Sequence, residues 1–409
     1  MGALAVTGGE KTRTKSFPAW PVFGEREENA LIETLRSGRW GMGDRIDAFE
    51  KAFGAYQDAE HCIAVMNGTA ALEVALKACG VKPGDEVIVP PYTFIATASS
   101  VVHVGGIPVF VDVEPDTCNL DPAKVEAAIT KQTRAIIAVH IGGRPADLDG
   151  IVAVGRKHGL KVIEDACQSH GAIWKGQKVG GIADAGTFSF QASKNLNAGE
   201  GGAVVSNNRE IGELAWSYHN CGRVKTGAWY EHHVLGSNYR MTEFQAALLL
   251  AQMEPLEAQT QTRQANGDYL TKLLNEVDGI ETMRADERVT RNAYHLYIFR
   301  YKPEAFGGLP KKKFIEALSA EGIPCSSGYV PLYKERAFTV SREYIPFDSA
   351  FYGGKVDYAK VSCPATERVC ADEAVWLTQR MLLGTKEDVE DIARAVRKVR
   401  VNCAELKSL

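Results

Sequence analysis

The stretch that decides the fold spans residues 161–206, which read KVIEDACQSHGAIWKGQKVGGIADAGTFSFQASKNLNAGEGGAVVS. It contains three short runs rich in valine, isoleucine and phenylalanine, at 161–164, 187–190 and 203–206. Continuous apolar runs of this length are typical of strands that are covered on both faces of a sheet. The first run is followed by Asp165, and a single lysine, Lys194, stands in the glycine-rich segment between the other two.

The same pattern extends toward the N-terminus, with further runs at 61–66, 86–90, 108–111 and 135–139. Helical patterns lie between them, for example at 69–79, 122–129 and 148–158. This alternation of strands and helices predicts an α/β domain with a mainly parallel sheet.

The pattern changes after Thr242. We expect helices at 244–253, 254–277, 311–321 and from 386 to about 399, and strands at 294–301 and 374–377. This mixture predicts a smaller α+β domain. We place the boundary near residue 256, give or take about ten residues. The large domain then spans 1–255, including an N-terminal arm over 1–20, and the small domain spans 256–409.

The composition excludes several function classes. The chain has 409 residues, of which 45% are hydrophobic, and a formal net charge of -4 without any basic block. This charge distribution lacks the basic patch that binds nucleic acid or an anionic membrane surface. No apolar run approaches the roughly 20 residues that span a bilayer. The nine cysteines contain no C-x-x-C pair, so we expect free thiols in a reducing compartment, no metal site and a cytoplasmic protein.

Lys194 is the first candidate for chemistry. A single lysine after a strand is usually a surface charge, but the segment that follows, 197–202, is rich in glycine and lets the backbone approach a ligand closely. A lysine that is desolvated beside other cations loses its proton more easily and becomes a nucleophile able to form a Schiff base.

Asp165 is the second candidate, because ligands of parallel sheets bind beyond the carboxyl ends of the strands. A carboxylate at that place keeps a pyridinium nitrogen protonated, so that the ring acts as an electron sink. The alternative is a turn or helix-capping aspartate. Gln168 could donate a hydrogen bond to a ring oxygen, whereas His170 is better explained as a structural residue.

A phosphate seat is indicated by Gly68 and Thr69, which lie between a strand and a helix, where free N–H groups and the helix dipole attract anions. A plain helix cap is the compatible alternative. Ser189 offers a second hydroxyl, and Phe94 could either stack on a flat cofactor or pack in the core. Together with Lys194, these residues suit pyridoxal 5'-phosphate (PLP).

The motifs also resemble a known family. They are NGTAAL at 67–72, PPYTF at 90–94, EDACQ at 164–168, SFQASK at 189–194 and GSNYR at 236–240. In this order they resemble the DegT–StrS family of PLP-dependent aminotransferases, which act on keto-sugars and keto-cyclitols. The resemblance covers about residues 21–399. It implies the fold-type I architecture: a seven-stranded, mostly parallel sheet sandwiched by helices, a smaller C-terminal domain, and a homodimer with shared sites.

The resemblance also implies a role for each matching residue. Lys194 would hold PLP as a Schiff base and move protons, and Asp165 would pair with the pyridine nitrogen. The remaining cofactor contacts would be Gln168 to the ring hydroxyl, Phe94 stacked on the ring, Gly68, Thr69 and Ser189 at the phosphate, and Asn238 at the phosphate of the neighbouring subunit.

The expected reaction moves an amino group from L-glutamate or L-glutamine to a keto-sugar or keto-cyclitol. Segment 190–202 is more similar to cyclitol and amino-shikimate members than to nucleotide-sugar enzymes. Two alternatives stay open: a dehydratase or lyase of the 3-amino-5-hydroxybenzoate synthase type, and a non-catalytic relative. The first of these would use the same Lys194 and Asp165. A separate branch of the family that this chain resembles carries histidine in place of the lysine and performs dehydration, and Lys194 disfavours that branch. Tyr329, Tyr333 and Arg39 either line the acceptor pocket or have ordinary core and rim roles.

Overall fold

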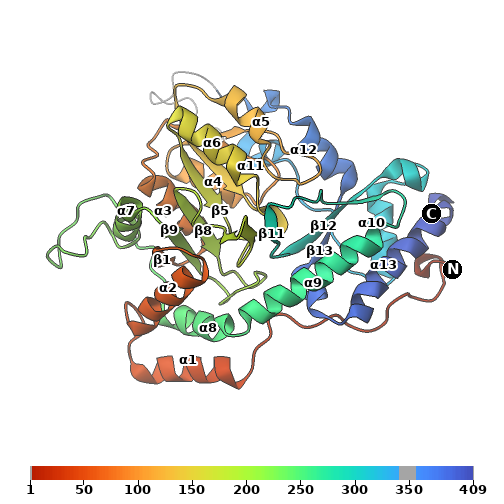
Figure 1. The fold of residues 1–409 in the computed structure, drawn as a ribbon, viewed down its shortest axis with the longest axis horizontal. Helices are drawn as coiled ribbons and strands as arrows, with labels where there is room; N and C mark the ends of the chain where they lie inside the picture. The colour runs from red at the N-terminus through yellow and green to blue at the C-terminus, as the bar shows by residue number, and fades with distance from the viewer. Residues whose placement is uncertain (1, 340–355, 409) are drawn as a thin grey trace.

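The computed structural model describes residues 2–339 and 356–408, and a seven-stranded sheet forms its centre (Figure 1). Six of its strands are parallel to one another, and β9 is antiparallel to them. The strand order is β1 (His61–Val65), β9 (Gly202–Ser206), β8 (Ala185–Ser189), β5 (Lys161–Asp165), β4 (Thr133–Val139), β2 (Glu86–Val89) and β3 (Ile107–Phe110). All seven expected strands are present within two residues of their expected ends, which confirms the fold class.

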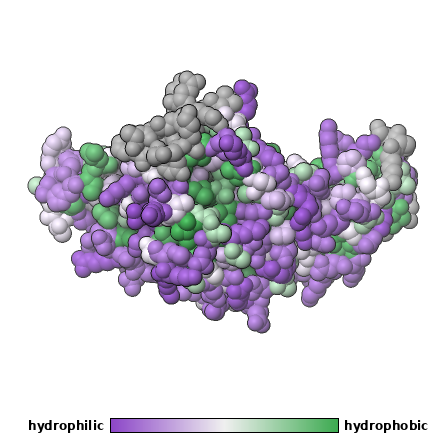
Figure 2. Space-filling view, turned by 90° about the horizontal axis from the view of Figure 1, so that it is seen from above, coloured by the Kyte–Doolittle hydropathy of each residue, from purple (hydrophilic) through white to green (hydrophobic). Residues whose placement is uncertain are grey.

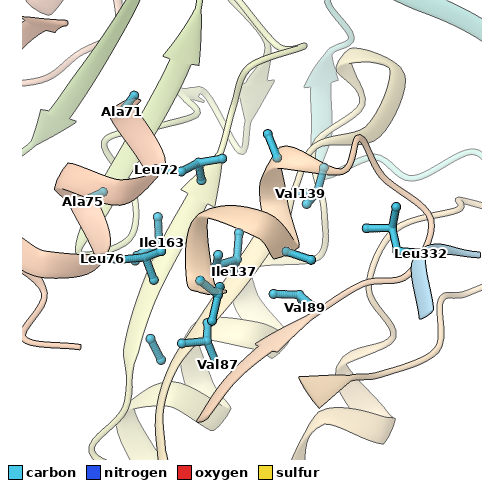
Figure 3. Close-up of a cluster of buried hydrophobic side chains, with 14 of the residues drawn as sticks. Ala71, Leu72, Ala75, Leu76, Val87, Val89, Ile137, Val139, Ile163 and Leu332 are labelled. Carbon is cyan, nitrogen blue, oxygen red and sulfur yellow. The ribbon is translucent and has the colours of Figure 1, made fainter. Parts of the chain in front are cut away.

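The sheet is covered by helices on both faces, because successive strand residues point to opposite sides. Ile137 and Val139 of β4 face a core layer shared with α3 (Gly68–Ala78) and α4 (Ala96–His103), part of which Figure 3 shows. Ile136 and Ala138 face the opposite layer, which includes α2 (Asp44–Tyr56), α6 (Leu148–His158) and α8 (Glu243–Met253). Two-sided burial explains why the strands are apolar runs without strict alternation.

Local sequence signals define the helix ends where they were expected. The side chain of Asp147 accepts a hydrogen bond from the N–H of Gly150 at 3.1 Å and caps α6, and Gly159 ends that helix with a φ of 65°. The expected helix at 122–129 is shorter in the structure. It consists of α5 (Pro122–Val125) followed by a 3-10 turn over Glu126–Ala128.

A second, antiparallel sheet follows in the C-terminal part, with the order β10 (Ile280–Thr282), β12 (Leu296–Tyr301), β13 (Ala374–Thr378). It shares an apolar core with α9 (Leu256–Leu274), α10 (Lys311–Ala320) and α13 (Lys386–Val401). A small third sheet joins β6 (Ile173–Trp174), β7 (Gln177–Lys178) and β11 (Val289–Arg291). The other helices are α1 (Glu25–Ser37), α7 (Arg209–His219), α11 (Arg336–Thr339) and α12 (Pro364–Arg368). The domain division at residue 256 stays a prediction.

The N-terminal arm packs against the C-terminal part of the chain. Leu4 and Phe17 are buried in the core of the second sheet. The guanidinium of Arg13 lies 2.8 Å from a carboxylate oxygen of both Asp388 and Asp391. In Figure 1 the arm therefore starts beside the C-terminus and runs along α13 and α9 toward α1.

Hydrophilic side chains dominate the outline of the face shown in Figure 2, and hydrophobic ones gather toward its middle. Among the described residues, no helix is both long and apolar enough to cross a membrane.

Candidate active site

A cavity of about 1000 Å³ lies beyond the carboxyl ends of the parallel strands. Its walls come from the segments that follow β1, β2, β5 and β8, since parallel strands present their carboxyl ends at one edge of a sheet. Seven of the expected site residues line it: Gly68, Thr69, Phe94, Asp165, Gln168, Ser189 and Lys194. The structure thus brings together residues that lie up to 126 positions apart in the chain (68 to 194).

The N-terminus of α3 forms one end of this cavity. The side chain of Asn67 caps the helix by accepting a hydrogen bond from the N–H of Ala70 at 2.8 Å. A Cβ atom on Gly68 would lie 2.7 Å from the Cβ of Ser189, so only glycine allows Ser189 to approach the helix end this closely. Thr69 and Ser189 both line the cavity and carry hydroxyls, and the dipole of α3 favours an anion at this helix end. This cradle fits a phosphate group.

Asp165 is held at the end of β5 by a buried chain of hydroxyls. Thr97 Oγ1 donates to Asp165 Oδ2 at 2.8 Å, and the hydroxyls of Thr93 and Thr97 lie 2.9 Å apart. The N–H of Cys167 also donates to Asp165 Oδ1, at 3.3 Å. Only 5% of Asp165 is exposed. A carboxylate oriented and buried in this way suits a cationic partner such as a pyridinium N–H.

Lys194 lies in the loop between β8 and β9, and its side chain enters the cavity. Burial lowers the pKa of its ammonium group, against the opposing influence of Cys167 and Asp165. The next residue, Asn195, is buried, and its Nδ2 donates to the carbonyl of Ala293 at 2.7 Å. The loop is therefore anchored, and the lysine is partly prepared for the neutral state that a nucleophile requires.

The amide of Gln168 is fixed at both ends. Its Oε1 accepts from the N–H of Gly142 at 2.7 Å, and its Nε2 donates to the hydroxyl of Tyr329 at 3.0 Å. The second N–H of that amide group remains available to a ligand oxygen. Phe94 is 58% exposed and lines the cavity, so it is not the core residue that the alternative explanation required.

His170 has a structural position, as expected. It is fully buried, and its ring centroid lies 5.5 Å from that of Phe188 and 5.7 Å from that of Phe190. Burial, assisted by the charge of Lys194, lowers the pKa of His170 to about 3, so the imidazole is neutral. It does not line the cavity.

Three residues with an expected role lie away from the cavity of this chain. Asn238 is exposed, and it pairs in an isolated β-bridge with Asn220, the residue that follows α7. Tyr333 is a core residue whose hydroxyl donates to Glu367 Oε1 at 2.6 Å. Arg39 is exposed and pairs with Asp44. Of the three residues considered for the acceptor pocket, only Tyr329 lines it.

Sequence reasoning missed several residues of this site. Thr93 lies in the loop after β2 and Thr97 in the first turn of α4, within or just beyond the PPYTF motif, and their hydroxyls could have been noticed there. Trp20 comes from the N-terminal arm, and no local pattern places it near a strand end. His295, Trp376 and Arg380 also line the cavity from the C-terminal part. Only tertiary packing brings these residues to the edge of the large sheet.

Comparison with known proteins identifies the family. Residues 21–397 match the sequence model of the DegT/DnrJ/EryC1/StrS aminotransferase family. The chain belongs to this family. Membership confirms the resemblance drawn from the motifs, and it makes the protein a PLP-dependent aminotransferase of fold-type I.

Individual relatives cover nearly the whole chain. A protein of Streptoalloteichus tenebrarius, provisionally named an L-glutamine:3-amino-2,3-dideoxy-scyllo-inosose aminotransferase, is 42% identical over 412 residues, which cover 99% of each chain. A second protein of that organism, named L-glutamine:2-deoxy-scyllo-inosose aminotransferase, is 38% identical over 428 residues, with 99% of each chain covered. The crystal structure of a 3-amino-5-hydroxybenzoic acid synthase is 36% identical, with a TM-score of 0.85 over 94% of this chain and 98% of that one.

Proposed function

We propose that this aminotransferase moves the amino group of L-glutamine to a keto-cyclitol of the scyllo-inosose type. The observation that carries the proposal is the match, at 42% and 38% identity over 99% of each chain, to proteins named for that donor and that class of acceptor. The composition of segment 190–202, which lines part of the cavity, supports the same substrate class.

The cavity residues would each contact a different part of PLP. Gly68, Thr69 and Ser189 would hold the phosphate of PLP at the N-terminus of α3, and Phe94 would stack on the ring. Gln168 would donate its remaining N–H to the ring oxygen. Asp165, oriented by its hydroxyl partner, would face the pyridine nitrogen, and Lys194 would hold the cofactor covalently.

The reaction requires proton transfers that this chain can perform. When bound, PLP supplies an electron sink for the charge that develops on the α-carbon of the donor. Lys194 Nζ would accept the proton from that α-carbon and pass it to the cofactor, and in the second half-reaction it would take a proton from the cofactor and deliver it to the acceptor carbon. The lowered pKa of Lys194 increases the fraction that is neutral and able to accept the proton. A carboxylate at the position of Asp165 would stabilise a protonated ring nitrogen.

The site would be completed by a second copy of the chain. Asn238 does not line the cavity of its own chain, and it follows an exposed segment that carries three strongly exposed hydrophobic residues, Trp229, Tyr230 and Leu235. Exposed hydrophobic groups of this kind mark interaction surfaces. We therefore propose a homodimer in which Asn238 reaches the phosphate site of the partner.

One alternative keeps specific support. The 36% identity and the TM-score of 0.85 to a 3-amino-5-hydroxybenzoic acid synthase are compatible with an elimination that uses the same lysine and aspartate. An elimination would release water from the substrate and leave an unsaturated or aromatic product. Transamination would leave an aminocyclitol and the keto acid of the donor, so product mass separates the two reactions.

The test begins with the absorbance spectrum of the purified protein with PLP. We expect a lysine-bound PLP band that L-glutamine converts to the spectrum of the aminated cofactor, followed by its reversal with 2-deoxy-scyllo-inosose. Lys194→Ala should lack the band, whereas Lys312→Ala, which changes an exposed lysine of α10, should keep it. A band that neither L-glutamine nor L-glutamate discharges would contradict the aminotransferase proposal.

A further inference from the structure

The N-terminal arm contributes an aromatic ring to the active-site cavity. Trp20 lines the cavity, although it lies outside the loops at the strand ends of the large sheet and outside the second sheet. Its indole Nε1 donates to the carbonyl of Ala192 at 3.1 Å, only two residues before Lys194. The arm is held at a second point, where Arg380 Nη1 donates to the carbonyl of Pro18 at 3.1 Å. Trp20 therefore has a defined position beside the catalytic loop.

The indole ring of Trp20 packs near the guanidinium of Arg263. The guanidinium carbon of Arg263 lies 5.1 Å from the ring centroid of Trp20, and Arg263 is fully buried. Its Nε donates to Gln379 Oε1 at 2.9 Å, so the supporting cation is itself fixed. Trp20 is half-buried and lines the cavity, so part of its side chain is accessible from the cavity.

Four aromatic side chains line the cavity: Trp20, Phe94, Tyr329 and Trp376. Tyr329 and Trp376 pack edge-on against each other, with centroids 4.4 Å apart, and both also contact Tyr92. In the described part of the chain, Trp20 and Phe94 pack against no other aromatic ring that lines the cavity. Because Phe94 is expected to stack on the cofactor ring, Trp20 is the candidate among these four side chains for packing against a second ring.

A ring of the scyllo-inosose type is the ligand that such a surface fits. All its hydroxyls are equatorial, so they point outward around the edge, while both faces carry only axial C–H bonds. An apolar disc with a polar edge packs well on an aromatic face, and the edge would meet polar residues that line the same cavity, namely Gln191, Ser193, Thr378 and Gln379.

We propose that Trp20 is the platform on which the face of the cyclitol ring packs, so that the N-terminal arm selects acceptors with an all-equatorial ring. This inference rests on the proposed function, because it names the ring of the acceptor. Trp20 would act in the second half-reaction alone, since an open-chain amino acid donor has no ring face.

The kinetic test separates the two half-reactions in Trp20→Leu and Trp20→Phe. We expect the KM for 2-deoxy-scyllo-inosose to rise by about tenfold or more in Trp20→Leu and by less than about threefold in Trp20→Phe, because phenylalanine keeps an aromatic face. The rate of the L-glutamine half-reaction and the lysine-bound PLP band should stay near those of the wild type. Trp216→Leu, which changes a half-buried tryptophan of α7 away from the cavity, is the matched control.

A binding measurement tests the shape argument without turnover. Isothermal titration of the wild type carrying the aminated cofactor, the form that the acceptor meets, should show tighter binding of scyllo-inositol than of neo-inositol, which carries an axial hydroxyl on each face. Trp20→Leu should lose this preference. Equal affinities in the wild type would overturn the proposal.

The outcomes also separate this inference from the proposed function. A wild-type enzyme that does not aminate the keto-cyclitol refutes the proposed function, and the inference falls with it. If the wild type aminates it and Trp20→Leu keeps its KM, only the inference is overturned. If Trp20→Leu slows both half-reactions equally, Trp20 merely anchors the arm, and the inference is again overturned.

Discussion

Replacing Thr97 with valine should remove a hydrogen bond that orients the carboxylate of Asp165 without changing the shape of the site. Thr97 Oγ1 donates to Asp165 at 2.8 Å, and the other hydrogen bond to that carboxylate, from the N–H of Cys167, is longer, at 3.3 Å. Thr97 is 1% exposed. Water therefore cannot easily replace the lost donor, and the carboxylate would lose its shorter hydrogen bond.

The size of the effect follows from the chemistry of the bond. A hydrogen bond to a charged group contributes about 1.5–3 kcal/mol. Since about 1.4 kcal/mol corresponds to a factor of ten in rate, we expect kcat/KM for the L-glutamine half-reaction to fall by roughly 10- to 100-fold in Thr97→Val. The assay is stopped-flow absorbance, which follows the loss of the lysine-bound PLP band on mixing with L-glutamine.

Two variants serve as controls. Thr97→Ser keeps the hydroxyl and should remain close to the wild type. Thr93→Val removes the next hydroxyl, which lies 2.9 Å from that of Thr97 and has no bond to Asp165, so its effect should be clearly smaller. In an Asp165→Asn background, Thr97→Val should cost much less than it does alone, because the charged partner is already gone.

The reasoning would be refuted by either of two results. The first is a Thr97→Val rate within about twofold of the wild type, which would mean that the bond contributes far less than a charge-assisted bond normally does. The second is full additivity with Asp165→Asn, which would show that Thr97 acts on something other than that carboxylate.

Three further predictions concern stability, the phosphate seat and the dimer. Burial raises the pKa of Glu50 from 4.5 to about 7. Because the pKa is higher in the folded than in the unfolded chain, the protonated carboxyl stabilises the fold at low pH. This stability, about 3 kcal/mol, is lost as the pH rises from 4.5 through 7. Glu50→Gln should therefore raise the Tm at pH 8.5 and not at pH 4, and an equal shift at both would contradict this. Gly68→Ala places a Cβ 2.7 Å from that of Ser189 and should weaken PLP binding by about tenfold in a fluorescence titration; an unchanged affinity would exclude this seat. If Asn238 acts in the partner's site, mixing inactive Lys194→Ala and Asn238→Ala chains should restore up to about a quarter of wild-type activity, whereas no recovery would place Asn238 elsewhere.

Much of the large domain could be predicted from the sequence because its strands are buried on both faces. Apolar runs such as the one at 135–139 have few interpretations once helical patterns separate them. The short strands β6, β7, β10 and β11 were not predicted. They have two or three residues each, and at most one residue of each is buried, so their sequences carry almost no hydrophobic pattern.

The site was predictable to the extent that its residues follow strand ends. Asp165 comes directly at the end of β5 and Gly68 opens the helix after β1, and both positions can be read from local pattern. Tyr333 was open to either role, and burial decided it: the residue is 1% exposed and belongs to the core. An aromatic residue in a loop has the same local signature in a core as in a pocket, so sequence could not separate the two.

By itself, the sequence determined the family and the order of the longer strands and helices, and it predicts the chemistry at Lys194 and Asp165, because each depends on residue type and on neighbours along the chain. Tertiary structure alone decided which distant residues share the cavity. Trp20 reaches Ala192 only because the arm first packs Leu4 and Phe17 into the core of the second sheet and then crosses to the large one. Contacts across such separations depend on how whole surfaces fit together, and no local pattern encodes that fit.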